Sequence, residues 1–240
     1  MDVDQRASRI APRVRAHLAR AVGRGRHVLL DFDGVMFDVR AAMGPEAREQ
    51  AITGLLMGRE HRPRSVPVTF SFFGVYPTLE YLAKHEPDHA VEAEALMSGL
   101  EVDAALTAKP TRGLDQLLAV CAAAGRKVAV ISDLSEDAVW ATLRAHTLDR
   151  YVAAVAARQG LDLPGIDAGC TAERAADLLG VPVASCLVVC GSFLRLYQAR
   201  RAGAIGLGCE CGRDSRKHLA ANQTPVVSNL ATLAQALLAP

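Results

Sequence analysis

The sequence has almost no net charge and no long hydrophobic segment. Its 27 Lys and Arg face 26 Asp and Glu, a formal net charge of +1, so nothing attracts the chain generally to nucleic acid or to anionic membranes. No uninterrupted apolar run approaches the roughly 20 residues that span a bilayer, and the arginine-containing N-terminus lacks the apolar core of a secretory signal. We therefore expect a cytoplasmic protein with no nucleic-acid partner and no membrane partner.

Cysteine is too sparse to build a small disulfide scaffold, with six residues in a chain of 240. Cys209 and Cys211, together with Cys186 and Cys190, offer enough thiolates for a tetrahedral zinc site. Their C-x-C and C-x₃-C spacings are not the usual pattern for zinc. Reduced, partly buried thiols are the simpler interpretation, and a thiolate metal protein stays as an alternative.

Internal repeats and low-complexity tracts are also lacking. What the chain does have is the composition of a soluble globular protein, 50% hydrophobic and 22% charged. Apolar, strand-like runs alternate with helical segments over much of its length. The expected strands are residues 27–32, 127–131, 152–156, 186–189, 204–208 and 226–227. Strands separated by crossover helices predict an α/β fold with a doubly wound parallel sheet.

Two segments depart from this alternation. Residues 6–22 place apolar side chains at helical spacing between arginines, which predicts an amphipathic helix docked on the domain. Residues 38–107 favour helices near 46–57, 77–84 and 89–106, separated by Pro- and Gly-containing breaks, with the aromatic residues between 70 and 81 as its core. The expected division is a helix in 1–21, an α/β core of 22–37 and 108–240, and a helical insertion at 38–107.

Polar residues follow three of the predicted strands. The stretch "VLLDFDGVMFD" carries Asp31 and Asp33, although a buried strand rarely ends in two carboxylates because burying unpaired charge is costly. "VAVISD" carries Ser132, and "CLVVCGS" carries Gly191 and Ser192. Parallel strands end at one edge of a sheet, so these groups are expected in one cleft. The simpler alternative is that the two acids cap a turn and Ser132 is a loop serine.

In this order the motifs resemble those of the haloacid dehalogenase-like (HAD) hydrolase superfamily. D-x-D-G-V resembles motif I, and "VAVISD" resembles motif II. "GVPVASCLVVCGSFLRLYQARRAGAIGLG" is similar to motif IV with the helix that follows it. The insertion at 38–107 falls where the family has a helical cap. The resemblance runs from about His27 to the C-terminus, and it implies a HAD-like Rossmannoid core that carries a phosphatase-type active site.

The resemblance implies a role for five residues. The Asp31 carboxylate would attack phosphorus and form an aspartyl-phosphate, and Asp33 would protonate the leaving oxygen and then activate water. Gly34 would let the backbone approach the phosphoryl group, and Ser132 would hydrogen-bond it. Arg158 is the candidate phosphate-binding cation. The family's Mg²⁺ would bind the Asp31 carboxylate and the Asp33 carbonyl, and the substrate would be a small phosphorylated metabolite, a phosphomonoester.

Two motifs depart from the family pattern. Gly191 and Arg195 stand where motif IV has its acids, and "LDLPGID" replaces the motif III lysine. Weak or lost Mg²⁺ binding and reduced activity are therefore expected, although Arg195 could carry part of the metal's charge and Asp133 could replace a ligand. Asp at positions 191 and 195 together would be expected to restore the metal site. The alternative is an inactive HAD-like protein that binds a phosphorylated metabolite or a protein partner.

Overall fold

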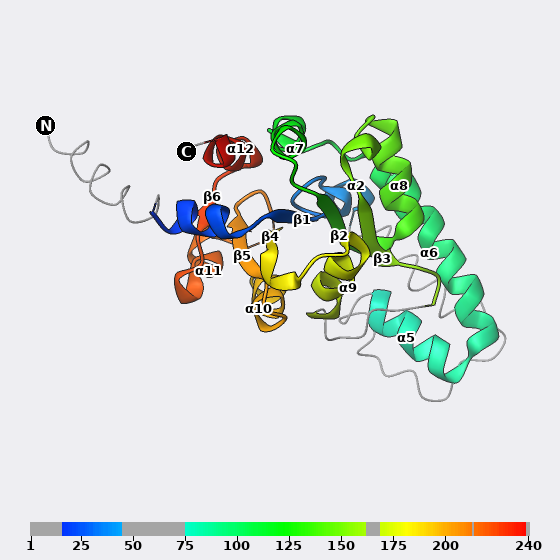
Figure 1. Ribbon diagram of the computed structural model, residues 1–240. Helices are drawn as coiled ribbons and strands as arrows, with labels where there is room; N and C mark the ends of the chain where they lie inside the picture. The colour runs from blue at the N-terminus through cyan, green and yellow to red at the C-terminus, as the bar shows by residue number, and fades with distance from the viewer. Residues whose placement is uncertain (1–15, 45–74, 162–168, 213, 239–240) are drawn as a thin grey trace, which may run out of the picture.

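A six-stranded parallel β-sheet forms the centre of the molecule (Figure 1). The computed structural model describes residues 16–44, 75–161, 169–212 and 214–238. The strand order is β3-β2-β1-β4-β5-β6, and each neighbouring pair is parallel. The strands are β1 (His27–Asp31), β2 (Val128–Ser135), β3 (Ala154–Arg158), β4 (Cys186–Cys190), β5 (Ile205–Cys209) and β6 (Val226–Val227). The predicted parallel α/β sheet is confirmed.

Helices cover both faces of the sheet because its strands are apolar on both sides. Val28 and Leu30 of β1 pack in one buried cluster with α7, α8 and α12, whereas Leu29 packs in a second cluster with α9 and α10. The two layers lie on opposite sides of the strands in Figure 1. These helices are α7 (Leu114–Ala123), α8 (Glu136–Ala145), α9 (Gly169–Leu179), α10 (Phe193–Arg201) and α12 (Leu230–Leu238).

The chain changes direction across the sheet at β1. It continues from β1 to β2 and β3 on one side, and it then returns to β4, β5 and β6 on the other side. In open parallel sheets, ligands bind beyond the carboxyl ends of the strands at such a switch point. Asp31 ends β1 and Cys190 ends the adjacent β4. The topology therefore places the D-x-D-G segment where this class of fold binds ligands.

Helix α6 (Pro87–Thr107) contributes buried side chains to two separate clusters. Near its start, Ala90 and Met97 join Leu79 of α5 (Val75–His85) in a small separate cluster. Near its end, Ala105 is buried in the main core. One continuous helix therefore connects the two parts of the molecule, and the division at 107/108 stays a prediction.

Two local features differ from the expectation. Strand β2 continues to Ser135 instead of ending at Ile131, because Ser135 still pairs with Arg158 of β3 after an irregularity in the register. The short helix α11 was not expected, since four residues carry little periodic signal. Ser135 caps α8, because its hydroxyl accepts a hydrogen bond from the Ala138 N–H. The remaining short elements are α2 (Val39–Met43), α11 (Arg216–Leu219), η1 (Asp149–Tyr151), η2 (Val183–Ser185) and η3 (Ala221–Gln223).

Residues 16–24 are helical, and Ala21 and Val22 are buried in the main core cluster, so this part of the N-terminal segment docks on the α/β core. The first part of the expected helix, the helix near 46–57 and the aromatic residues at 70–73 lie outside the described residues. Within the described part of the chain, every helix is too short or too polar to cross a bilayer.

Candidate functional site

The two acids of the D-x-D-G segment are held differently. Asp31 is the last residue of β1 and is only 6% exposed. Asp33 lies in the turn that follows and is half-buried. Its Oδ1 accepts a hydrogen bond of 3.0 Å from the Val39 N–H at the start of α2. The turn needs Gly34, whose φ is +87° and whose N–H donates to the Phe37 carbonyl. The Asp31 carboxylate is thus buried at the end of β1, and the Asp33 carboxylate is held in the following turn by its hydrogen bond to α2.

Ser132 lies on the strand next to Asp31. In the register of β1 and β2, Asp31 pairs with Ile131, so Ser132 is one residue further along the neighbouring strand. Its side chain is buried, and its Oγ accepts a hydrogen bond of 3.0 Å from the Leu134 N–H. That bond uses a lone pair, which leaves the hydroxyl proton as a donor. The sequence expected these residues at one sheet edge, and the strand register brings them there.

Arg195 reaches the Asp31 carboxylate from α10. Its Nε lies 3.4 Å from Asp31 Oδ2, and its Nη2 lies 2.5 Å from Asp133 Oδ2. The arginine side chain is only 12% exposed. Burial alone would lower the pKa of Arg195, but the Asp31 and Asp133 carboxylates outweigh it and raise that pKa. A guanidinium that stays charged therefore bridges the end of β1 to the end of β2.

The position after β4 has no room for a side chain. A Cβ built on Gly191 would lie 2.3 Å from the Cα of Gly212, in the loop that follows β5. The same loop is tied to this turn by Asp214, whose N–H donates to the Gly191 carbonyl and whose carboxylate accepts from the Phe193 N–H at 2.6 Å. The expectation that an Asp at 191 would restore a metal ligand is therefore wrong, because the Gly212 backbone occupies the space that its side chain needs.

These residues do not fit the divalent metal that the family resemblance implies. Hard cations need several oxygen ligands. Here Oδ2 of Asp31 contacts a guanidinium, and position 191 offers no carboxylate. Across the residues that the structure describes, no three His, Cys, Asp or Glu side chains gather closely enough to hold a metal ion. Asp133, the candidate replacement ligand, is paired with Arg195 as well.

Arg158, the expected phosphate-binding cation, is fully buried and bonded to α6. Its two terminal nitrogens contact Glu94 and Glu101. Glu101 also accepts a hydrogen bond of 2.7 Å from the Ser135 N–H. Burial raises the pKa of Glu101, and the nearby arginine opposes that rise. The cluster ties α6 to the ends of β2 and β3. A phosphate-binding role for Arg158 stays a prediction.

The cysteines do not form the four-thiolate zinc site. Cys209 and Cys211 are joined by a disulfide, with their Cα atoms 5.2 Å apart, which corrects the expectation that both are reduced. The turn after β5 brings them together. Cys186 and Cys190 are buried free thiols. Burial raises the pKa of both, and the Asp31 carboxylate raises that of Cys190 further. Neutral thiols are poor metal ligands.

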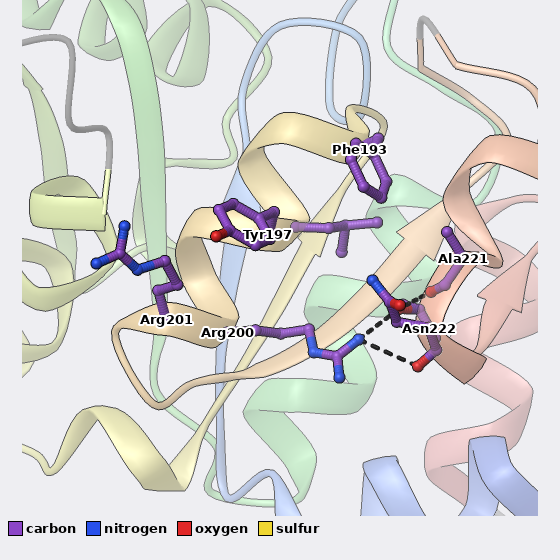
Figure 2. Close-up of a pocket in the computed structure, with 8 residues that line it drawn as sticks. Phe193, Tyr197, Arg200, Arg201, Ala221 and Asn222 are labelled. Atoms are coloured by element: carbon purple, nitrogen blue, oxygen red, sulfur yellow. Dashed lines mark hydrogen bonds between the residues drawn. The ribbon is translucent and has the colours of Figure 1, made fainter.

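The opposite face of α10 lines a cavity of about 270 Å³ together with η3 (Figure 2). Phe193, Tyr197 and Arg200 lie on this face, and Arg200 donates to the Asn222 carbonyl. Arg195 is two residues from Phe193 and from Tyr197, about 200° around the helix, so it points the other way. The cavity is lined by neither Asp31 nor Asp33, and α10 thus separates it from the candidate site.

Solved structures share the fold of this chain. No family model and no curated protein matches the sequence. A variant of CbbY from Rhodobacter sphaeroides, in complex with xylulose-1,5-bisphosphate, matches with a TM-score of 0.63 at 17% identity, over 86% of this chain and 95% of that one. A hydrolase from Pseudomonas syringae matches with a TM-score of 0.62 at 16% identity, over 89% and 99% of the two chains. A HAD hydrolase of family IA from Entamoeba histolytica matches with a TM-score of 0.60 at 14% identity, over 87% of this chain and 99% of that one.

The chain has the fold of the HAD hydrolases. The fold expected from the motif order is thereby confirmed. Asp31, Asp33, Ser132 and Arg195 lie within a few residues of the ends of strands that apolar runs predict, which is why the sequence pattern points to them. Sequence reasoning missed Asp214, which approaches the site from a loop 21 residues after Phe193 and carries no motif of its own.

Replacing Arg158 with Met is expected to lower the free energy of unfolding by about 3–5 kcal/mol, because it leaves Glu101 buried without its cation. The loss should be smaller at low pH. A carboxyl whose folded-state pKa is raised is stabilised while protonated, and the penalty grows as the pH rises above its unfolded-state pKa. Urea denaturation at two pH values measures both effects. Arg144→Met, at an exposed position of α8, is the control, and a loss as small as in that control would contradict a stabilising cluster.

Gly191→Ala is expected to cost about 1–3 kcal/mol or more, because the new methyl group meets backbone that cannot rotate away. Gly206→Ala in β5 is the matched control. Its Cβ would meet the flexible side chains of Arg200 and Leu196 at 3.3 Å, so a loss below about 1 kcal/mol is expected. Urea denaturation of both variants compares them. Equal stabilities would show that the loop after β5 yields easily to a side chain at 191.

Proposed function

We propose that the protein is a phosphatase-type hydrolase that acts on a small phosphorylated metabolite. The observation that carries this proposal is the pair Asp31 and Asp33 at the end of β1, at the switch point of a sheet with the HAD hydrolase fold. The CbbY variant with that fold is in complex with a sugar bisphosphate, which supports the same class of substrate here. The fold alone does not give the reaction, so the roles below rest on the site residues.

Asp31 is the proposed nucleophile. One oxygen of its carboxylate attacks the phosphorus atom of the monoester, and the bond from phosphorus to the alcohol oxygen breaks. Asp33 gives its proton to that oxygen, so the alcohol leaves and an aspartyl-phosphate remains. Asp33, now ionised, takes a proton from water, and the oxygen of that water attacks phosphorus. Inorganic phosphate leaves, and the Asp31 carboxylate is restored.

The surrounding contacts suit these roles. The Val39 N–H holds Oδ1 of Asp33, which fixes the acid above the end of β1. The Ser132 hydroxyl keeps a proton to donate to a phosphoryl oxygen, because its recorded contact with Leu134 uses a lone pair. The Arg195 guanidinium lies beside the Asp31 carboxylate, where negative charge gathers during phosphoryl transfer. A single guanidinium provides less charge than a metal ion, so slow turnover is expected.

Asp31→Asn is expected to abolish hydrolysis of a generic aryl phosphate, because an amide cannot form the aspartyl-phosphate. Asp33→Asn should slow it by about 10²–10⁴-fold, the usual effect of losing a general acid. Release of the coloured phenolate measures the rates. Asp38→Asn is the matched control: Asp38 lies exposed on the same loop, where its Oδ1 accepts a hydrogen bond from the Ala41 N–H. Turnover by Asp31→Asn at the wild-type rate would exclude the proposed nucleophile.

A second candidate is an inactive HAD-like protein that binds a phosphorylated metabolite or a protein partner. The ion pair between Asp31 and Arg195 favours it, because a cation on the attacking oxygen weakens the nucleophile. Saturable binding of inorganic phosphate, measured by calorimetry, without turnover of any of a panel of phosphomonoesters would support this second function. Turnover that depends on Asp31 would exclude it.

A further inference from the structure

One guanidinium contacts two carboxylates at the edge of the sheet. Arg195 reaches Asp31 on β1 and Asp133 on β2 through different nitrogens. Asp31 is nearly buried, and a buried carboxylate is strongly destabilised unless a cation or several donors compensate it. In phosphoryl-transfer sites that use a metal, the ion both compensates the carboxylates and binds the phosphoryl oxygens. Here the first of those tasks is already done by a side chain.

The packing at Gly191 also keeps a further carboxylate ligand away from Asp31. Gly191 follows β4, beside the end of β1, and its would-be Cβ collides with the Gly212 backbone. The guanidinium itself fills the space between the Asp31 and Asp133 oxygens and repels a second cation. The steric contact only denies the site a ligand at position 191, whereas the guanidinium charge repels a divalent ion beside Asp31, and replacing Arg195 removes that repulsion.

We infer that Arg195 is the resident cation of the Asp31 site, so that the site holds its phosphoryl ligand without a divalent metal ion. The phosphoryl part rests on the proposed function, whereas the exclusion of the metal does not. Arginine suits the task because its planar fork matches both carboxylate and phosphate oxygens and it stays charged in proteins. Lysine would offer only a point charge.

One nitrogen of the Arg195 guanidinium donates no hydrogen bond to the described residues. Nη1 of Arg195 is buried and has no hydrogen-bond acceptor among the residues that the structure describes. A buried donor without an acceptor costs about 1–3 kcal/mol. A phosphoryl oxygen beside Asp31 gives this nitrogen an acceptor when the side chain turns to meet it, which a metal ion cannot do.

Removing the guanidinium should create a metal site. The test uses the full-length protein and Mn²⁺, a probe for Mg²⁺ sites whose free form is counted by electron paramagnetic resonance. Arg195→Ala leaves the Asp31 and Asp133 carboxylates without their shared cation, and it should bind one Mn²⁺ about 10–100-fold more tightly than the wild type. Arg195→Ala combined with Asp31→Asn should return to the wild-type level. Arg200→Ala, on the other face of the same helix, is the control and should bind as the wild type does.

Each result bears on the inference whether or not the protein hydrolyses phosphoesters. Wild-type protein that binds one Mn²⁺ as tightly as Arg195→Ala would overturn it, and so would a folded Arg195→Ala that gains no site. Circular dichroism checks the fold of each variant, and Arg195→Gln replaces the alanine variant if that one does not fold. The two experiments can also disagree. If the protein does not hydrolyse the aryl phosphate but the variants bind Mn²⁺ as expected, the proposed reaction is rejected and the assignment of Arg195 as the resident cation is kept.

Discussion

The ion pair between Arg195 and Asp31 is the interaction on which the candidate site depends. A carboxylate at the end of a central parallel strand is largely removed from water, and its charge must be compensated within the protein. Arg195 does this from the first turns of α10 and shares its charge with Asp133 on the neighbouring strand. The pair therefore fixes the ends of β1 and β2 relative to α10. It also decides what else can enter, because the position beside Asp31 is already held by a cation.

The loop after β5 completes this arrangement. Gly212 packs directly on Gly191, and Asp214 binds both the Gly191 carbonyl and the first N–H of α10. Such an approach of two backbones requires glycine on both sides, because a Cβ on either one would meet the other. An acid at position 191 therefore requires a movement of this loop, because its Cβ would collide with the Gly212 backbone. Glycine at position 191 is thus required by the packing of the loop after β5.

Much of the fold was predictable, because the signals for its strands and helices lie within short segments of the sequence. The strands are continuous apolar runs and most helices carry a clear period, so their order and the parallel sheet follow from the sequence. Asp31, Asp33 and Ser132 could be found because they close or follow the apolar runs of β1 and β2, although β2 itself continues to Ser135. The contacts that define the site join residues far apart in the chain. Arg158 meets Glu101 across 57 residues, and Gly191 meets Gly212 with no side chain to signal it. No periodic pattern records such pairs.

The electrostatics of the site explain why substituting an arginine for a metal changes the chemistry. A divalent ion brings two charges that its ligands can surround from several directions, whereas a guanidinium brings one charge and donors confined to a plane. Arg195 already uses Nε and Nη2 on two carboxylates, so a dianionic phosphoryl group must compete with them for the same cation. Arg158 adds little, because Glu94 and Glu101 already neutralise it. The site therefore holds the Asp31 carboxylate, the proposed nucleophile, more firmly than it compensates the charge of a phosphoryl group beside it.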